Sequence, residues 1–339
     1  MTTLTTLKRY LASPYLRLGV GTALTLLTLY ILVREVDLQV VGRLLVQAER
    51  GAVLVALLTV LVNVLGKAAR WRVLLGPAGK QIPFGQTLSV LLIGQMLNTL
   101  LPIRVGDLTR AHLIGSRGPG RSFTMGTIIL EKASDLLCYA LLFLLLLLWI
   151  PLPSWVQAQL PSMFLLSFAV LACLLLALYF GGNRVGLQAA ERWLPASLRA
   201  AGEQGLRGAL SSLDILRRRD DTLKIALWSS LIWMMAILTN YFVLQSLHLD
   251  GSPVSALFVL LVLQLGITIP SVPGTIGIFE YLCVLTLALF AVESSAALSF
   301  GILLHALVLL PTLIGLILFW TLGLALPPSS EPDVASLPQ

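Results

Sequence analysis

The chain consists of long apolar stretches separated by short polar connections. A membrane-spanning helix takes roughly 20 apolar residues, and several stretches reach that length. The stretches are continuous rather than alternating, which favours helices over a membrane β-barrel. We therefore predict an all-α polytopic membrane protein. The candidate apolar segments are 15–33, 51–66, 86–101, 123–150, 162–181, 223–246, 254–269, 276–292 and 296–325.

Two shorter segments run into a break of proline and glycine among polar residues. The first break lies in LLIGQMLNTLLPIRVGDLTR (91–110) and the second in LQLGITIPSVPGTIGIFE (263–280). Backbone is interrupted at membrane depth only where protein or a watery cavity satisfies its polar groups. Paired interruptions in the two halves of a chain point to a transport site between two repeats. The residues that we expect to form the breaks are Asn98, Pro102, Gly106, Pro270, Pro273, Gly274 and Gly277.

The distribution of Lys and Arg predicts the orientation of the segments. These residues cluster before residue 18 and in 67–85, 103–122 and 182–224, and the positive-inside rule places such clusters, with the N-terminus, in the cytoplasm. Segment 86–101 lies between two clusters, so we expect a re-entrant helix that enters and leaves on the cytoplasmic side. Segment 254–269 has a similar length and break but starts from the external side.

These assignments predict two inverted repeats in one transmembrane domain, residues 1–326. Repeat one spans about 51–150 and repeat two about 223–292, with about seven full crossings and two re-entrant broken helices, and 327–339 is a disordered tail. A complete crossing at 254–269 would instead add one crossing. In the cytoplasmic loop 182–222, leucines recur at helical spacing, which predicts an amphipathic helix on the inner leaflet, either an anchor or a reader of anionic headgroups. These leucines are Leu206, Leu210, Leu213 and Leu216.

Composition narrows the classes of function. Apolar residues make up 57% and charged residues 12% of the chain, and the mean hydropathy is +0.92. The net charge of +7 comes from residues spread over membrane loops, so we expect no nucleic-acid binding. Cys138, Cys173 and Cys283 lie in apolar runs without paired spacing, so we expect no disulfide and no metal site. The chain has no nucleotide-binding or catalytic motif, and we expect neither a cofactor nor enzymatic activity.

Ionisable residues inside apolar segments are costly and therefore mark candidate sites. Glu131 and Asp135 are four residues apart and share a helix face. At 1.5 Å per residue, Asp135 lies about 22 Å from the segment end at residue 150. Their expected partners are Arg70, Arg104 and Arg110, with Asp107 beside the first break. This set is either a structural ion-pair network or a site where guanidinium groups contact a lipid phosphate, and both can hold at once.

Three further polar residues have a structural and a functional interpretation. Glu280 follows the second break and is either a helix cap or part of the polar lining of a pathway. We expect Asn98 to bond freed backbone rather than a headgroup. We expect His305 to be a satisfied helix histidine rather than a proton relay.

Four motifs carry a resemblance to a known family: KAARWRVLLG (67–76), NTLLPIRVGDLTRAHLI (98–114), ILEKASDLL (129–137) and IPSVPGTIGIFE (269–280). In order and spacing they resemble the flippase-like membrane family, which includes the membrane half of bacterial lysylphosphatidylglycerol synthases. The resemblance spans nearly the whole chain. Lys132 stands where arginine is usual, and Thr275 replaces the second glycine of a Pro-Gly-Gly, which should restrict the turn.

The resemblance implies a protein of the cell membrane that moves a phospholipid or lipid-linked headgroup between leaflets. Because the chain ends at residue 339 with a short tail, we expect the soluble aminoacyl-transfer domain of the two-part synthases to be absent. Two alternatives stay open: a non-transporting partner of lipid or glycan biosynthesis proteins, and a membrane-embedded lipid-modifying enzyme. By carry-over, the expected substrate-binding residues are Arg70, Arg104, Asp107, Arg110, Glu131, Asp135 and Glu280.

Overall fold

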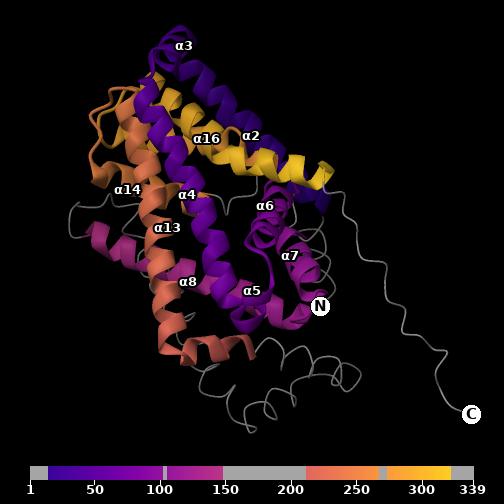
Figure 1. The fold of residues 1–339 in the computed structure, drawn as a ribbon. Helices are drawn as coiled ribbons and strands as arrows, with labels where there is room; N and C mark the ends of the chain where they lie inside the picture. The colour runs from indigo at the N-terminus through magenta and orange to yellow at the C-terminus, as the bar shows by residue number, and fades with distance from the viewer. Residues whose placement is uncertain (1–13, 102–104, 148–210, 267–272, 322–339) are drawn as a thin grey trace, which may run out of the picture.

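The computed structural model describes residues 14–101, 105–147, 211–266 and 273–321 (Figure 1). Every described element is a helix, which confirms the all-α prediction. The predicted segment 162–181 lies outside the described residues. The elements are α2 (Pro14–Glu35), α3 (Leu38–Gln47), α4 (Arg50–Leu74), α5 (Gly76–Gln81), α6 (Phe84–Leu100), α7 (Val105–Gly115), α8 (Arg121–Leu147), the 3₁₀ helix η2 (Ser212–Arg217), α13 (Arg219–Ser246), α14 (Pro253–Gly266), the 3₁₀ helix η3 (Pro273–Thr275), α15 (Ile278–Ala288) and α16 (Ser294–Thr321).

Among the described helices, α4, α13 and α16 are long and apolar enough to cross a membrane. Large apolar side chains are exposed on them, including Leu54, Leu58, Leu227 and Ile317. A soluble protein rarely exposes so much apolar surface, whereas lipid tails solvate it. The chain is therefore a multi-pass membrane protein, and the count of about seven crossings stays a prediction.

Helices α4 and α13 form the central antiparallel pair and lie side by side (Figure 1). At one end of the pair, the Glu49 N–H donates to the Ser246 carbonyl at 2.8 Å. Near the middle, the hydroxyls of Thr59 and Thr239 lie 2.8 Å apart. Such polar contacts hold membrane helices together because lipid tails are as apolar as the side chains that face them.

Helices α6 and α7 form an antiparallel hairpin around the first break. A Cβ atom on Gly106 would lie 1.9 Å from the carbonyl oxygen of Gly94, so only glycine permits this approach of the two backbones. The break therefore reverses the chain onto itself. Pro102 and Arg104 lie between the two helices in the sequence and outside the described residues.

Helices α14 and α15 form a second antiparallel hairpin around the second break. A Cβ atom on Gly266, at the end of α14, would collide with the Leu282 side chain of α15. Farther from the break, the rings of Phe258 and Phe290 pack edge to face with centroids 5.8 Å apart. Both breaks of the sequence thus produce helical hairpins. Pro270 lies outside the described residues.

The backbone just before α15 turns through left-handed conformations. The φ angles are 78° at Gly274, 57° at Thr275 and 86° at Gly277. Glycine adopts this region freely, whereas a β-branched residue is strained there. Thr275, the departure from the family pattern, therefore occupies a position that favours glycine.

Helix α16 packs against both hairpins. A Cβ atom on Gly301 would lie 3.3 Å from Glu280 Cα of α15, and one on Gly315 would lie 2.4 Å from the Leu92 carbonyl oxygen of α6. Helix α6 also contacts η3. The two hairpins therefore share α16 as a common support.

The two ends of the α4–α13 pair differ in charge. The end near α5 and η2 carries Arg72, Lys80, Arg117, Arg121, Arg217, Arg218, Arg219 and Lys224 against Asp214, Asp220 and Asp221. The described part of the other end carries Arg34, Arg43 and Arg50 against Asp37, Glu49, Asp250 and Glu293. The structure thus gathers the basic clusters of 67–85, 103–122 and the end of 182–224 at one end, as the positive-inside rule requires of loops on one side.

The end of the predicted amphipathic loop differs from the prediction. Residues 212–217 form a 3₁₀ helix, and Ile215 is buried in a core cluster with residues of α4 and α7. Leu213 and Leu216 pack against the same cluster. These two leucines therefore face protein rather than the inner leaflet, while Leu206 and Leu210 lie outside the described residues.

Candidate functional site

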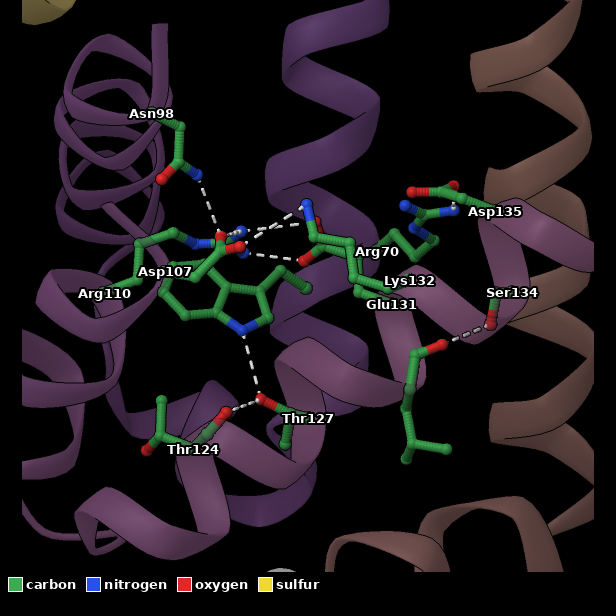
Figure 2. A network of polar contacts seen from close by, with 12 residues as sticks. Arg70, Asn98, Asp107, Arg110, Thr124, Thr127, Glu131, Lys132, Ser134 and Asp135 are labelled. Carbon is green, nitrogen blue, oxygen red and sulfur yellow. Dashed lines mark hydrogen bonds and ion pairs between the residues drawn. The ribbon is translucent and has the colours of Figure 1, made fainter. Parts of the chain in front are cut away.

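A buried ion pair joins the first hairpin to α8. Arg110 of α7 donates from Nη1 and Nη2 to the two carboxylate oxygens of Glu131, at 3.2 and 2.6 Å (Figure 2). The stem of Arg110 lies on Gly94, where a Cβ would collide with it. The guanidinium lies over the Trp71 ring at 4.1 Å. Lysine cannot reproduce this bidentate and stacked geometry.

Asn98 of α6 completes the hydrogen bonding at the first break. Its Oδ1 accepts from the Gly106 N–H at 2.9 Å, and its Nδ2 donates to Asp107 at 3.2 Å. The Gly106 N–H lies in the first turn of α7, where backbone donors lack an intrahelical partner. Asp107 also lies 3.5 Å from Arg110 and 3.9 Å from Lys132. The side chain of Asn98 therefore substitutes for backbone partners at the break.

A second ion pair joins α4 to α8. Nη1 of Arg70 donates to Asp135 at 2.6 Å and to the Ser229 hydroxyl of α13 at 3.0 Å. The Arg70 side chain is 0% exposed, whereas that of Asp135 is 31% exposed. Nε and Nη2 of Arg70 and Nε of Arg110 are buried without a hydrogen-bond partner among the described residues. Buried guanidinium donors are costly at membrane depth unless a ligand or water meets them.

Among the described residues, the cluster around these pairs contains one more basic group than it has carboxylates. Lys67 of α4 is half-buried and lies close enough to Asp135 and Glu131 to interact with them electrostatically, but within the described part of the chain it forms no hydrogen bond or ion pair. The cationic members are Lys67, Arg70, Arg110 and Lys132, and the carboxylates are Asp107, Glu131 and Asp135. With all four basic groups protonated, one monovalent anion would neutralise the cluster.

A separate acid–base pair lies in the second hairpin. Oε1 of Glu280 lies 2.5 Å from Nδ1 of His305 of α16, and Oε2 accepts from the Gly277 N–H at 2.6 Å. The His305 ring stacks on Phe279 with centroids 4.3 Å apart. The backbone contact makes Glu280 a cap of α15, while its other oxygen ties α15 to α16. Among the described residues, no hydrogen bond or ion pair links Glu280 to the first cluster.

Among the expected substrate-binding residues that the structure describes, five lie close together and Glu280 lies apart. Two neighbouring groups of ion pairs meet at α8, one of Arg110 with Asp107 and Glu131 and the other of Arg70 with Asp135 (Figure 2). Glu280 lies in the second hairpin, and Arg104 lies outside the described residues. Lys67, Trp71 and His305 were missed as members of these sites. One face of α4 carries Lys67, Arg70 and Trp71. An aromatic residue next to a charged residue at membrane depth was the sequence feature that could have identified Lys67 and Trp71.

The chemistry that the cluster favours is anion binding. Its cations lie on three different helices. Along α8 the cluster is accessible from outside, because Asp135 is partly exposed and Lys132 is 49% exposed. No group of three His, Cys, Asp or Glu side chains in the described part of the chain could hold a metal ion.

Comparisons with known proteins agree with the motifs. The family model of the lysylphosphatidylglycerol synthase TM region matches residues 17–315. A UPF0104 membrane protein of Methanocaldococcus jannaschii is 26% identical over 210 residues, which cover 59% of this chain and 82% of that protein. No solved structure matches this chain.

Proposed function

The chain belongs to the family of the lysylphosphatidylglycerol synthase TM region, and from this premise we propose that it moves an anionic phospholipid or lipid-linked headgroup between the leaflets of the cell membrane. The observation that carries the proposal is the excess positive charge beside the first hairpin. An uncompensated charge at membrane depth costs several kcal/mol, and the phosphodiester of a lipid headgroup supplies one negative charge. No bond is made or broken in this process, so the proposal assigns no enzymatic activity.

The hydrogen-bond donors of the cluster support a phosphate ligand. Nε and Nη2 of Arg70 form an unpartnered guanidinium edge, and an edge of this kind binds two oxygens of one phosphate. Lys67 adds a point charge one helical turn away on α4. Both Nη atoms of Arg110 already pair with Glu131 and Asp107, and only its Nε lacks a partner among the described residues, so its role in the proposal is to hold the hairpin in place.

Two inverted repeats give the proposal a mechanism. The described helices α4, α6, α7 and α8 contain 25, 17, 11 and 27 residues, and α13, α14, α15 and α16 contain 28, 14, 11 and 28. In each set, a buried acid–base pair joins the second helix of the hairpin to the long helix that follows, Arg110–Glu131 in one and Glu280–His305 in the other. On the basis of this pairing, we propose that repeat two continues to the end of α16, beyond the boundary near 292 that the sequence suggests.

Transport would then follow from rocking of one repeat against the other. Alternating access in inverted-repeat transporters exposes a midplane site first to one side and then to the other. The headgroup would enter from the basic, cytoplasmic end and pass Lys67 and Arg70 while its acyl chains stay in lipid. In this arrangement the two hairpins are the re-entrant elements, the N-terminus is cytoplasmic, and the full chain crosses the membrane about seven times.

The test is leaflet exchange of fluorescent phosphatidylglycerol and phosphatidylcholine in proteoliposomes. We expect the wild-type protein to exchange the anionic lipid and Lys67→Gln to lose most of that exchange. Lys67 breaks no ion pair when replaced, so the variant should fold normally, which gel filtration checks. Arg50→Gln removes an exposed charge from the opposite end of α4 and should retain wild-type exchange.

Three outcomes would contradict the proposal. Wild-type exchange no faster than in protein-free liposomes, across anionic and polyprenyl-phosphate lipids, would favour a non-transporting partner of lipid or glycan biosynthesis proteins. Chemical conversion of the lipid during the assay would favour an enzyme. Exchange that survives Lys67→Gln unchanged would place the headgroup site elsewhere.

A further inference from the structure

A cleft opens at the basic end of the molecule, away from the ion pairs of α8. It has a volume of about 310 Å³ and lies between the C-terminal end of α4, the short helix α5 and the N-terminal end of α13. Four cationic side chains and one carboxylate line it: Arg72, Lys80, Arg218, Lys224 and Asp221. The net charge of the lining is therefore strongly positive.

Part of this charge has no partner in the described part of the protein. Lys224 lies 3.5 Å from Asp221, and Arg72 donates from Nε to the Gly79 carbonyl at 2.8 Å. The second contact orients the Arg72 guanidinium and leaves both its Nη atoms without a hydrogen bond. Lys80 and Arg218 form no hydrogen bond or ion pair with any described side chain. The cleft therefore presents at least three cations to a ligand.

The backbone adds a further positive potential. Helix α13 begins beside the cleft at Arg219, and its N-cap, Arg218, makes no side-chain capping hydrogen bond. The first N–H groups of a helix lack intrahelical partners and carry the positive end of its dipole. The positive end of this dipole therefore lies beside the cleft, where the carboxylates of Asp220 and Asp221 in the same turn offset part of it, so the cationic side chains carry most of the attraction for an anion.

The apolar surroundings of the cleft favour a lipid. Phe84 and Trp228 line its walls, and a tryptophan at this height is typical of the membrane–water interface. Leu223 and Leu227, on either side of Lys224 along α13, are 59% and 61% exposed. A ligand with a phosphate headgroup in the cleft could therefore rest its acyl chains on the outer surface of α13.

We propose that this cleft binds the phosphate group of an anionic ligand, with a phospholipid headgroup of the cytoplasmic leaflet as the favoured source and a free organic phosphate as the other. The site is separate from the cluster of Lys67 and Arg70. Binding here requires no movement of lipid between leaflets, so the proposal holds or fails independently of transport.

The test measures ligand binding to the full chain in neutral detergent by the shift of its thermal unfolding. The probes are phosphatidylglycerol, phosphatidylcholine and glycerol 1-phosphate. We expect phosphatidylglycerol to stabilise the wild-type protein and the Lys80→Gln/Arg218→Gln variant to bind it about tenfold or more weakly, because two charge-assisted contacts with the phosphate are lost.

Arg219→Gln is the matched control. Arg219 lies next to Arg218 and carries the same charge, but it is exposed and does not line the cleft. The affinity of this variant for phosphatidylglycerol should therefore stay within about twofold of the wild type, because solvent screens an exposed charge. Lys80 is exposed on a short helix, so Lys80→Gln alone provides a folded variant if the double variant fails to fold.

Each outcome decides the proposal. Weaker binding confined to the cleft variants supports it, and competition by glycerol 1-phosphate at similar concentration identifies a free phosphate as the ligand. An equal loss in Arg219→Gln would show attraction by overall charge alone and overturn the site. Equal stabilisation by phosphatidylcholine, or no stabilisation by any probe, would also overturn it.

Discussion

Replacement of Arg110 by Met isolates the ion pair that holds the first hairpin to α8. Met preserves an unbranched stem against Gly94 and removes the guanidinium. Glu131, 4% exposed, then loses both of its hydrogen bonds. Removing one member of a buried pair costs about 3–5 kcal/mol, and the lost contact with the Trp71 ring adds about 0.5–2 kcal/mol. We therefore expect the free energy of unfolding to fall by about 4 kcal/mol or more.

The double variant Arg110→Met/Glu131→Met shows whether this cost comes from the stranded carboxylate. With both charges gone, two apolar side chains of similar length fill the same space, and the cost should fall to about 1 kcal/mol or less. The two single variants and the double variant form a double-mutant cycle. Because each single substitution strands a buried charge at a cost of about 3 kcal/mol or more and the double variant does not, the coupling energy should be about 6 kcal/mol or more.

The assay is reversible unfolding in mixed micelles, with the free energy extrapolated linearly to zero denaturing detergent by analogy with denaturant titration. Additive costs of the two single substitutions would refute the argument, because they would mean that the charges do not stabilise each other. A cost below about 1 kcal/mol for Arg110→Met would refute it as well, since it would mean that Glu131 finds water or another partner.

Three further predictions test the backbone and the orientation. Gly106→Ala should destabilise the hairpin by about 1–3 kcal/mol through overpacking. The control Gly85→Ala, at a glycine with no neighbour within 4 Å, should stabilise α6 by about 0.5–1 kcal/mol. Equal effects of the two substitutions in the same unfolding assay would contradict the close contact at Gly106. Thr275→Gly should leave stability unchanged or raise it by about 1 kcal/mol, because it releases a strained φ angle, and a clear loss would argue against the left-handed turn. In a chain without its native cysteines, Ser116→Cys should react with an impermeant maleimide only from the cytoplasmic side and Asp250→Cys only from outside; the reverse pattern would invert the topology.

The helices of the described core follow closely from the sequence. Each predicted apolar segment in the described residues lies within or overlaps a helix, because the backbone of a membrane segment satisfies its hydrogen bonds within the helix and lipid accepts only apolar side chains. The apolar segment 51–66, which the pattern ends before Lys67, forms only part of a helix. Helix α4 continues to Leu74 because protein partners, Asp135 and Ser229, satisfy Arg70 there.

The kinds of residue that form the candidate site were also predictable from the sequence, before their partners were known. Charged side chains at membrane depth and glycines beside prolines stand out in an apolar sequence because each is costly unless something compensates it. The arginines and carboxylates near α8 were therefore visible as a group. Arg104 and the two prolines, Pro102 and Pro270, remain predictions because they lie outside the described residues.

Which of these residues pair with one another is visible only in the folded structure. Arg70 pairs with a residue 65 positions away and Glu280 with one 25 positions away, and helical spacing carries no information about which helices cross. The crossings depend on close glycine contacts such as those of Gly94 and Gly315. Local hydrogen bonding and lipid exposure thus dictate where the helices run, whereas the charge balance of the site follows from how distant helices pack, because a buried charge is neutralised only by groups that the packing brings within reach.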